Sequence, residues 1–487
     1  MAEIDTVSGT THEVVEPLTN YLLGRVQKDY NEGKTILGGI VTSTNRDLDA
    51  KLGSLMHKSA YSGGFDLTHY FKDKNWRFDF NTAFSQVNGS KEALQITQKS
   101  SARYFQRPDN DYAGYDPDRT SLSGSGGKMQ LQKLNGHLFL LGCILWRTPG
   151  FEINDLGYIQ EADAIYSLIA AGYKEWDPKW IYRNYNFSAN IWTAHNFGGQ
   201  PVGTGLAWNG FMNLKNYWNI WTGVNLSSAQ LSSGTLRGGP AMRIPGTLRF
   251  NGGFSGDHRK KLNFSIRANF SSGLEKNSRN FNTAMDITYK PANFLYLTLS
   301  PGYNPSFNEL QYVTKLNSGG SDKYFFASID RKTISSSFRV NINLSPDLTI
   351  QYWGQPFIAT GKYYDHKMIL NPTAGNFRDR FWTFTTAQKT FDEQNNQYRF
   401  DLNLDGTTDY VIGNNDFKVR EFLSNLVVRW EYSPGSSVYL VWSQTRSSYE
   451  NTGDLEFIDD VADLFNTADN HPHNVFLVKF SYRFGIK

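Results

Sequence analysis

Bulky apolar and polar residues alternate along much of this chain with a period of two. In WRFDFNTAFS (76–85), Trp76 and Phe78 fall on one face, and Arg77 and Asp79 fall on the other. A period of two is that of a β-strand, so each such segment predicts a strand with one apolar face and one face that can contact water. The same alternation recurs in four further segments: TLRFNGGFSG (247–256), KLNFSIRANF (261–270), SFRVNINL (337–344) and the C-terminal NVFLVKFSYRFGIK (474–487).

The connections between these segments alternate as well, between tight turns and long polar stretches. Short turns at one end and long loops at the other are typical of outer-membrane barrels, whose turns lie in the periplasm. The turns are NEGK (31–34), KDKN (72–75), LNGH (134–137), EWDPK (175–179), GDHRKK (256–261), KPAN (290–293), SPDL (345–348) and SPGSS (433–437). The polar stretches are 87–119, 148–160, 230–244, 305–323, 365–417 and 451–472.

The fold class follows from these two patterns. We predict an all-β protein, a large antiparallel transmembrane β-barrel of about 18–20 strands. A soluble β-sandwich or propeller also alternates, but its strands average about 5 to 6 residues, whereas many segments here alternate over the ~9 to 11 residues that cross a bilayer at a tilt. The mean hydropathy of -0.50 agrees with this class, because barrel strands place apolar residues among polar ones.

Strand directions suggest that the barrel is incomplete at its N-terminal side. If the short turns are periplasmic, the first strand, near residue 20, and the last strand both run towards the periplasm. Two such strands cannot pair in an antiparallel sheet, and lipid tolerates no unpaired edge. The first residues also lack the basic and apolar regions of a secretory signal. We therefore expect 1–19 to be a truncated N-terminal remnant and 20–487 to be the barrel domain, with long loops 87–119, 305–323, 365–417 and 451–472.

The polar faces of the strands are expected to line the lumen, while the apolar faces, including Phe264, meet lipid. The lumen side is mixed in sign and leans basic, which suits a water-filled or loop-plugged pore for polar or anionic solutes. The expected lumen-lining residues are Arg77, Asp79, Arg249, Arg267, Arg339, Lys479 and Arg483.

One local motif resembles a calcium loop. In DLNLDGTTDY (401–410), oxygen ligands stand at positions 1, 3, 5 and 9 of the pattern, with Gly406 where the chain turns sharply. Position 12 is Ile412 in place of a bidentate Glu, so the site would be weaker, or another carboxylate such as Asp416 would complete it. The alternative is a solvated Asp/Asn/Gly-rich turn. The candidate ligands of Ca²⁺ are Asp401, Asn403, Asp405 and Asp409; no cofactor is required.

Catalytic groups are sparse. Barrel hydrolases use a Ser/His or Asp/His pair, and the nine histidines here mostly stand alone, so we assign no catalytic residue and do not expect an enzyme. The aromatic loop YFQRPDNDYAGYDP (104–117) either stacks on sugar rings or folds its own rings inward as a plug or lid. Trp192 and Trp221 are interpreted as belt or packing residues. A net charge of +3 with scattered basic residues argues against nucleic acid as a partner.

Long segments of the chain also resemble a known family. NYLLGRVQKDYNEGKTILGGIVTSTNRD, YFFASIDRKTISSSFRVNINLSPDLTIQYWGQPFIATGKY and DFKVREFLSNLVVRWEYSPGSSVYLVWSQTR are similar to domain-of-unknown-function family 5916 (DUF5916) of Bacteroidota-type bacteria. The resemblance implies an outer-membrane barrel that a signal peptide and a carbohydrate-binding-module family 9-like domain usually precede. Neither is found in these 487 residues. Some relatives are labelled hydrolases, but no matching catalytic motif is present to carry over.

Together these observations predict a protein of the bacterial outer membrane, in contact with its lipid and inserted by the barrel assembly machinery. The expected role is a pore or uptake component for a polar solute, and the usual extra domain of the family suggests a saccharide. An alternative role is surface binding or assembly, in which the long loops engage a glycan or a partner lipoprotein. A hydrolase carried by the loops is the weakest alternative.

Overall fold

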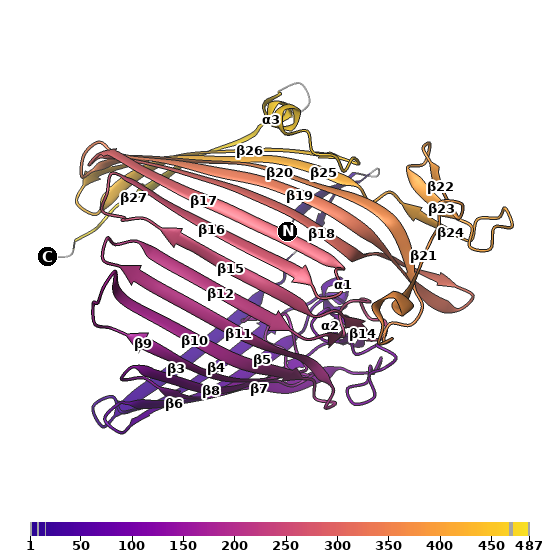
Figure 1. Ribbon diagram of the computed structural model, residues 1–487, viewed down its shortest axis with the longest axis horizontal. Coiled ribbons are helices and arrows are strands. Elements are labelled where there is room, and N and C mark those ends of the chain that lie inside the picture. Colours follow the sequence, from indigo (N-terminus) through magenta and orange to yellow (C-terminus); the bar gives the residue numbers. More distant parts are fainter. Residues whose placement is uncertain (1, 7–8, 15, 467–470, 486–487) are drawn as a thin grey trace.

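The computed structural model describes residues 2–6, 9–14, 16–466 and 471–485, and shows one long sheet rolled into a barrel (Figure 1). Within this part of the chain, 19 long strands pair antiparallel in chain order. They are β3 (Thr19–Tyr30), β4 (Thr35–Arg46), β5 (Ser59–Phe71), β6 (Trp76–Asn88), β7 (Ser121–Lys133), β8 (Leu138–Arg147), β9 (Ala164–Glu175), β10 (Tyr182–His195), β11 (Pro201–Leu214), β12 (Asn219–Ser227), β15 (Thr247–Ser255), β16 (Leu262–Gly273), β17 (Ser278–Ala292), β18 (Leu295–Ser318), β19 (Ser321–Asn343), β20 (Leu348–Ile369), β25 (Phe417–Ser433), β26 (Ser436–Glu450) and β27 (His473–Ser481). The predicted all-β antiparallel barrel is confirmed.

Tight turns close the strands at one end of the barrel. In NEGK, Asn31, Glu32 and Gly33 all adopt positive φ angles, and the ladder continues on either side up to the pair formed by Tyr30 and Thr35. Asn and Gly tolerate the left-handed backbone conformation, which is why these residues are common in β-hairpin turns. The sequence therefore specifies both the position of this turn and the register of its strands.

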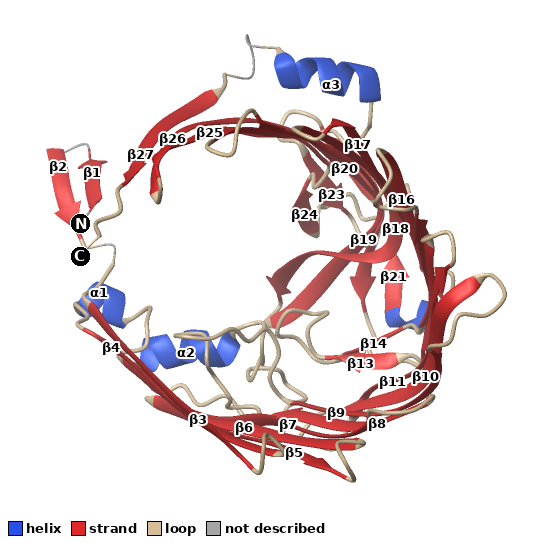
Figure 2. Ribbon diagram, turned by 90° about the vertical axis from the view of Figure 1, so that its left-hand side faces the viewer, coloured by secondary structure: helices blue, strands red, loops and turns tan. Residues whose placement is uncertain are grey.

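The two faces of the sheet are distinguished by what packs on them. Val87 on β6 is buried against Leu94 of α2 (Lys91–Lys99), and Figure 2 shows α2 inside the barrel. Paired residues of neighbouring strands point to the same face, so the strand registers carry this inward assignment around the barrel. The opposite, outward face carries exposed apolar side chains such as Phe84, Ile169 and Phe250.

The two edge strands, β3 and β27, meet at a seam. They are neighbours in the strand order, but the sheet is not closed between them, and a gap is visible there in Figure 2. Because 19 strands alternate in direction, β3 and β27 run the same way, as the strand directions in the sequence predicted. The residues of β27 are exposed throughout, which agrees with an unpaired edge.

At the other end of the barrel, the long connections contain structure of their own. They hold α1 (Ala50–Gly53), α2, the hairpin of β13 (Gln230–Ser232) and β14 (Met242–Ile244), η1 (Phe377–Arg380), β21 (Phe381–Thr383), a sheet of β22 (Lys389–Asp392), β23 (Gln397–Phe400) and β24 (Tyr410–Gly413), and α3 (Phe457–Phe465). A separate N-terminal hairpin pairs β1 (Ala2–Thr6) with β2 (Gly9–Glu13). Among the described residues, none of the helices is long and apolar enough to cross a membrane.

One predicted loop is wrong. Residues 305–323 do not form a loop but continue β18 and β19 as a hairpin that turns at Gly319 and Gly320, with Asn317 paired to Asp322. These strands extend beyond the length that lipid would cover, so neither face has to be apolar there and the alternation disappears from the sequence.

Candidate solute site in the barrel mouth

Two long connections fold back into the lumen at the loop end, and we call residues 89–120 and 148–163 together the plug. Gly124 and Gly126, on the inward face of β7, allow this close approach: a Cβ atom on Gly124 would lie 2.1 Å from the backbone nitrogen of Phe151, and one on Gly126 would lie 2.7 Å from its ring. Phe105 of the aromatic loop 104–117 is buried against Val87. The structure thus shows the inward-folded alternative for that loop.

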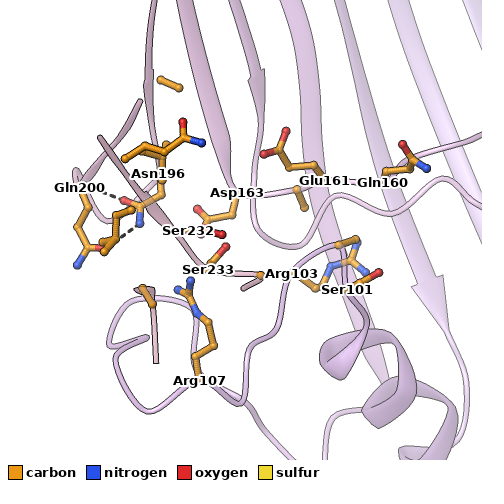
Figure 3. Close-up of a pocket in the computed structure, with 18 of the residues that line it drawn as sticks. Ser101, Arg103, Arg107, Gln160, Glu161, Asp163, Asn196, Gln200, Ser232 and Ser233 are labelled. Atoms are coloured by element: carbon orange, nitrogen blue, oxygen red, sulfur yellow. Dashed lines mark hydrogen bonds between the residues drawn. The ribbon is translucent and has the colours of Figure 1, made fainter. Parts of the chain in front are cut away.

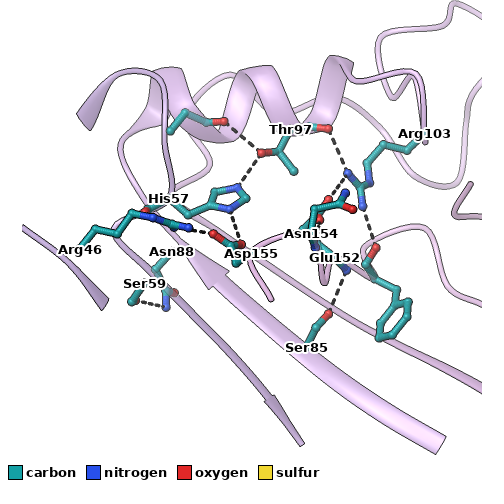
Figure 4. A network of polar contacts seen from close by, with 12 residues as sticks. Arg46, His57, Ser59, Ser85, Asn88, Thr97, Arg103, Glu152, Asn154 and Asp155 are labelled. Carbon is teal, nitrogen blue, oxygen red and sulfur yellow. Dashed lines mark hydrogen bonds and ion pairs between the residues drawn. The ribbon is translucent and has the colours of Figure 1, made fainter. Parts of the chain in front are cut away.

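A polar network fastens the plug to the barrel wall (Figure 4). Asp155 of the plug accepts a hydrogen bond from Arg46 of β4 at 2.5 Å, and His57 contacts both Asp155 at 2.9 Å and Thr97 of α2 at 2.7 Å. Burial by itself would raise the pKa of Asp155, but its bonds to His57 and Arg46 outweigh burial and lower the pKa overall. Asp155 is therefore held as a carboxylate.

A second buried ion pair joins the two halves of the plug to each other. Arg103 donates to the Glu152 carboxylate at 2.8 Å, and the exposed fractions of these side chains are 0% and 4%. Arg103 also donates to the carbonyl oxygens of Thr97 and Phe151, while the Glu152 N–H donates to Ser85 Oγ on the wall. A buried charge is tolerated when it is paired and its remaining donors are bonded, as here.

Between the plug and the wall formed by β9 to β11 lies a polar cavity of about 410 Å³, which we call the mouth cavity. Figure 3 shows its polar side chains converging from the plug, from the start of β9 and from the segments around β11 and β13. They are Ser101, Arg103, Arg107, Gln160, Glu161, Asp163, Asn196, Gln200, Ser232 and Ser233.

The cavity carries fixed groups of both charges. Asp163 accepts hydrogen bonds from the Tyr112 hydroxyl and, at 2.9 Å, from the Phe197 N–H. Burial raises the pKa of Asp163 and also that of Tyr112. The buried Arg107 has no hydrogen-bond partner for its Nε atom, and the Asp109 carboxylate is 3.8 Å from that atom. A buried donor without a partner is expensive, so Arg107 is the group in this cavity that most needs a ligand or water.

Trp192 of β10 forms an apolar part of the cavity wall. Its ring lies against the inward face of β11, where a Cβ atom on Gly205 would come within 2.7 Å of it. The amide of Asn196 is oriented by Gln200, which accepts from Asn196 Nδ2 at 3.0 Å. An aromatic face beside planar amides and a guanidinium offers both stacking and paired hydrogen bonds.

The structure places most of the predicted lumen-lining residues on the inward face. Arg77 and Asp79 form an ion pair at 2.7 Å there. Arg249 points inward on β15, and Arg267 lies 3.4 Å from the Asp286 carboxylate. The last two inward residues lie over aromatic rings: Arg339 over Trp353 and Lys479 over Tyr439.

Arg483 is an exception. It follows the end of β27 at Ser481, its N–H donates to Ser436 Oγ at 3.1 Å, and its aliphatic carbons lie beside Gly435 in the turn between β25 and β26. The strand ends earlier than the alternation suggested, so Arg483 lies beside the turn and not on the lumen wall.

The inward face also holds a set of asparagines that the sequence reasoning did not single out. A Cβ atom on Gly223 would meet the amides of both Asn209 and Asn251, so the glycine allows the two amides to approach across β12. Asn280 donates to Asn304 at 3.0 Å on the neighbouring strands. This part of the inward face thus carries neutral amides as well as charges, a feature that charged positions alone do not reveal.

The candidate calcium ligands lie together in the loop between β23 and β24. Their carboxylates accept backbone hydrogen bonds: Asp401 from Gly406 at 2.8 Å, Asp405 from Thr407 at 2.7 Å, and Asp409 from Leu402 at 2.6 Å. The amide of Asn403 donates to Asp405 at 2.9 Å. Among the described residues, no group of three or more His, Cys, Asp and Glu side chains is arranged to hold a metal. Calcium binding stays a prediction.

The main groups of the mouth cavity were not predicted as a site. Arg103, Arg107 and Asp163 lie in long connections whose folding the alternation does not specify, and Trp192 was interpreted as a belt or packing residue. The only sequence signal that Trp192 faces the lumen was its position next to Ile191 on β10, because adjacent strand residues point to opposite faces and Ile191 points outward. The aromatic loop 104–117 was the one plug segment that the sequence indicated.

A family model matches this sequence over residues 2–484; its description is "Domain of unknown function (DUF5916)". The chain belongs to this family. No curated protein matches the DUF5916 chain.

Solved structures resemble the DUF5916 barrel only distantly. The FrpB iron transporter from Neisseria meningitidis has 8% sequence identity and a TM-score of 0.40, covering 87% of this chain and 74% of its own. The siderophore receptor PirA from Acinetobacter baumannii has 10% identity and a TM-score of 0.41, covering 93% and 74%. A bacterial polysaccharide outer membrane secretin has 8% identity and a TM-score of 0.28, covering 74% and 89%.

Proposed function

We propose that this protein is an outer-membrane barrel through which a polar, hydroxyl-rich solute passes, and that the mouth cavity binds this solute on its way. The observation that carries the proposal is the cavity of about 410 Å³ between the plug and the wall, lined by charged, amide and hydroxyl groups with Trp192 as its aromatic face. The outward apolar face of the barrel supports the location, because only lipid covers such a surface on a closed or nearly closed barrel.

The chemistry of the cavity favours a saccharide. Arg107, Asp163 and Asn196 present planar polar groups that can bond neighbouring hydroxyls in pairs. Trp192 can stack on the C–H face of a sugar ring. The asparagines of the inward face offer further neutral donors and acceptors along the lumen, beside its charged groups.

The plug gives this pathway a gate. The Asp155 network fastens it to the wall, and the pair of Arg103 and Glu152 joins its two halves. Both connections are polar and few, and loops are the elements that move in such barrels. Breaking either connection should loosen the plug.

Solute flux tests the proposal. Purified protein in liposomes should admit a neutral disaccharide such as sucrose in a swelling assay. Arg107→Gln and Trp192→Phe should slow the flux at low sugar concentration. Asp118→Asn is the control, because Asp118 is exposed and pairs only with Lys91 at the surface. Equal flux in all three variants would refute the cavity as the binding site.

A second role has its own support. Residues beyond the barrel wall form a folded unit in which Phe325 of β19 packs with Phe400 of β23 and Ile412 of β24. Such a rigid surface suits recognition of a glycan or a partner lipoprotein without conduction. Liposomes that show no flux of any solute, together with glycan binding that is lost on deletion of 385–415, would favour this role. In either case the barrel assembly machinery would insert the protein.

A further inference from the structure

The helix α3 lies outside the barrel, against the outward face of β20 and β25 (Figure 2). Leu464 is fully buried between Ile358 and Phe422. Phe465 also packs on Phe422, with ring centroids 5.1 Å apart, yet Phe457, Ile458 and Phe465 are still 53%, 80% and 49% exposed. An amphipathic helix with apolar residues left exposed beside a lipid-facing wall is typical of the membrane interface.

Charged residues fix this helix in place. Lys418 and Arg420 lie on the outward face of β25, the face that also carries Phe422. Asp460 of α3 bonds Lys418 at 3.0 Å and Arg420 at 2.9 Å, and Arg420 also contacts Asp463 at 3.2 Å. A bare cation on the lipid face costs up to about 2–4 kcal/mol at mid-bilayer, so Asp460 together with Asp463 and Glu450 neutralises the two cations, and Asp460 anchors α3.

Between α3 and the wall lies an apolar groove of about 640 Å³. Its floor consists of outward residues on neighbouring strands, among them Pro301, Ser336 and Pro356, and its roof consists of Phe457, Val461 and Phe465. The larger strand residues Tyr303 and Ile334 also line the groove. This groove is separate from the mouth cavity, which lies on the inward side of β9 to β11.

We propose that this groove holds one acyl chain of a lipid from the outer leaflet of the surrounding membrane, with α3 as the clamp over it. The inference rests on the outer-membrane location proposed above, but not on conduction. In this state Phe457 and Phe465 contact hydrocarbon on both sides.

Two features indicate a lipid as the occupant: the groove is continuous with the lipid-facing surface, and it lies at the depth of the outer leaflet. Its floor is part of the outward apolar face, so lipid reaches it without leaving the bilayer. At ~3.3 Å per residue and a ~40° tilt, Ser336 lies about 18 Å along the barrel axis from the turn end of β19 at Asn343. This is the upper part of an apolar band about 25 Å tall, on the side of the long loops. The charged and amide side chains that a polar solute would need are absent from the residues that line this groove.

Lipid spin-label spectroscopy tests the proposal on the whole protein. The protein is reconstituted in vesicles of phosphatidylethanolamine and phosphatidylglycerol that contain a phospholipid labelled near the end of one acyl chain. The wild type should show a motionally restricted component beyond that of the general lipid shell. Ser336→Trp, which fills the floor, should remove that excess. Thr222→Trp, which makes the same change at an outward position on β12, should keep it.

A second variant protects the test from misfolding. Val461→Trp fills the groove from the helix and leaves every strand unchanged, so it should remove the excess signal even where Ser336→Trp fails to assemble. Three results would overturn the proposal. The excess signal could persist in the filled variants, it could be missing in the wild type, or a partner protein could co-purify and occupy the groove in place of lipid. Conductance should be the same in Val461→Trp and wild type, so failure of the pore proposal and failure of this one are distinguishable.

Discussion

Arg103 and Glu152 form a buried ion pair at 2.8 Å that joins two connections far apart in the sequence, one after β6 and the other after β8. The backbone N–H of Glu152 also donates to Ser85 Oγ on the barrel wall (Figure 4). Removal of one partner of a buried pair typically costs about 3–5 kcal/mol, because the other charge is left alone. This pair is therefore the point at which a single substitution should release the plug.

Glu152→Gln should loosen the plug without unfolding the barrel. The expected result is faster proteolytic cleavage within 104–117, since the loop would no longer be held inside. Asp118→Asn, in the same segment, removes an exposed pair with Lys91 and should leave cleavage unchanged. Equal cleavage of Glu152→Gln and wild type would show that the pair does not hold the plug.

Acid should loosen the plug where Asp155 binds Arg46 and His57. The pKa of Asp155 is lowered in the folded state, so the stabilisation it supplies is complete above its ordinary pKa of about 3.9 and is lost as the pH falls through the lower folded value. Proteolysis of the plug should therefore accelerate below about pH 4. Asp155→Asn should show fast cleavage already at pH 7 and little further change with acid. A wild-type protein whose cleavage does not respond to acid would contradict this assignment.

Arginine substitutions at two depths in the bilayer test whether the outward face meets lipid. Phe250 lies near the middle of β15, whereas Phe264 lies close to the turn end of β16 and packs with Trp218 and Phe254. Phe250→Arg should destabilise folding into vesicles by about 2–4 kcal/mol, and Phe264→Arg by about 0–1 kcal/mol. The inward Arg267→Ala should have little effect on urea-induced unfolding. A larger loss for Arg267→Ala than for Phe250→Arg would mean that the two faces are exchanged.

The seam predicts that β3 and β27 do not pair directly with each other, because both edges run the same way. In a variant with Cys143→Ser, cysteines at Val26 and at successive positions of β27 from Val475 to Lys479 should not form disulfides in native membranes. Edges that do not pair lie beyond the ~7 Å reach of a disulfide. Efficient crosslinking at any of these positions would show direct closure of the barrel.

Calcium binding remains to be measured at the loop between β23 and β24. Titration calorimetry at millimolar Ca²⁺ should give heat for the wild type and none for Asp401→Asn with Asp405→Asn. The predicted affinity is weak, since Ile412 stands where the bidentate Glu of an EF-hand would be. No heat in the wild type would leave the carboxylates with only their backbone hydrogen bonds.

The sequence was most informative where lipid constrains it. Alternation predicted the strands and their two faces because outward positions in lipid are mostly apolar, as at Phe250 and Phe84. Beyond the lipid this constraint ends, so the hairpin at 305–323 was interpreted as a loop. The mouth cavity was missed for the same reason: Arg107 and Asp163 meet only after two long connections fold inward, and no local periodicity specifies that contact.

The central claim, a water-filled barrel gated by its plug, is tested most directly by single-channel conductance in planar bilayers. The wild type should show rare or small steps, and Glu152→Gln should show larger or more frequent steps that Asp118→Asn does not. Absence of steps at every voltage in both the wild type and Glu152→Gln, with the barrel shown to be folded, would contradict the claim.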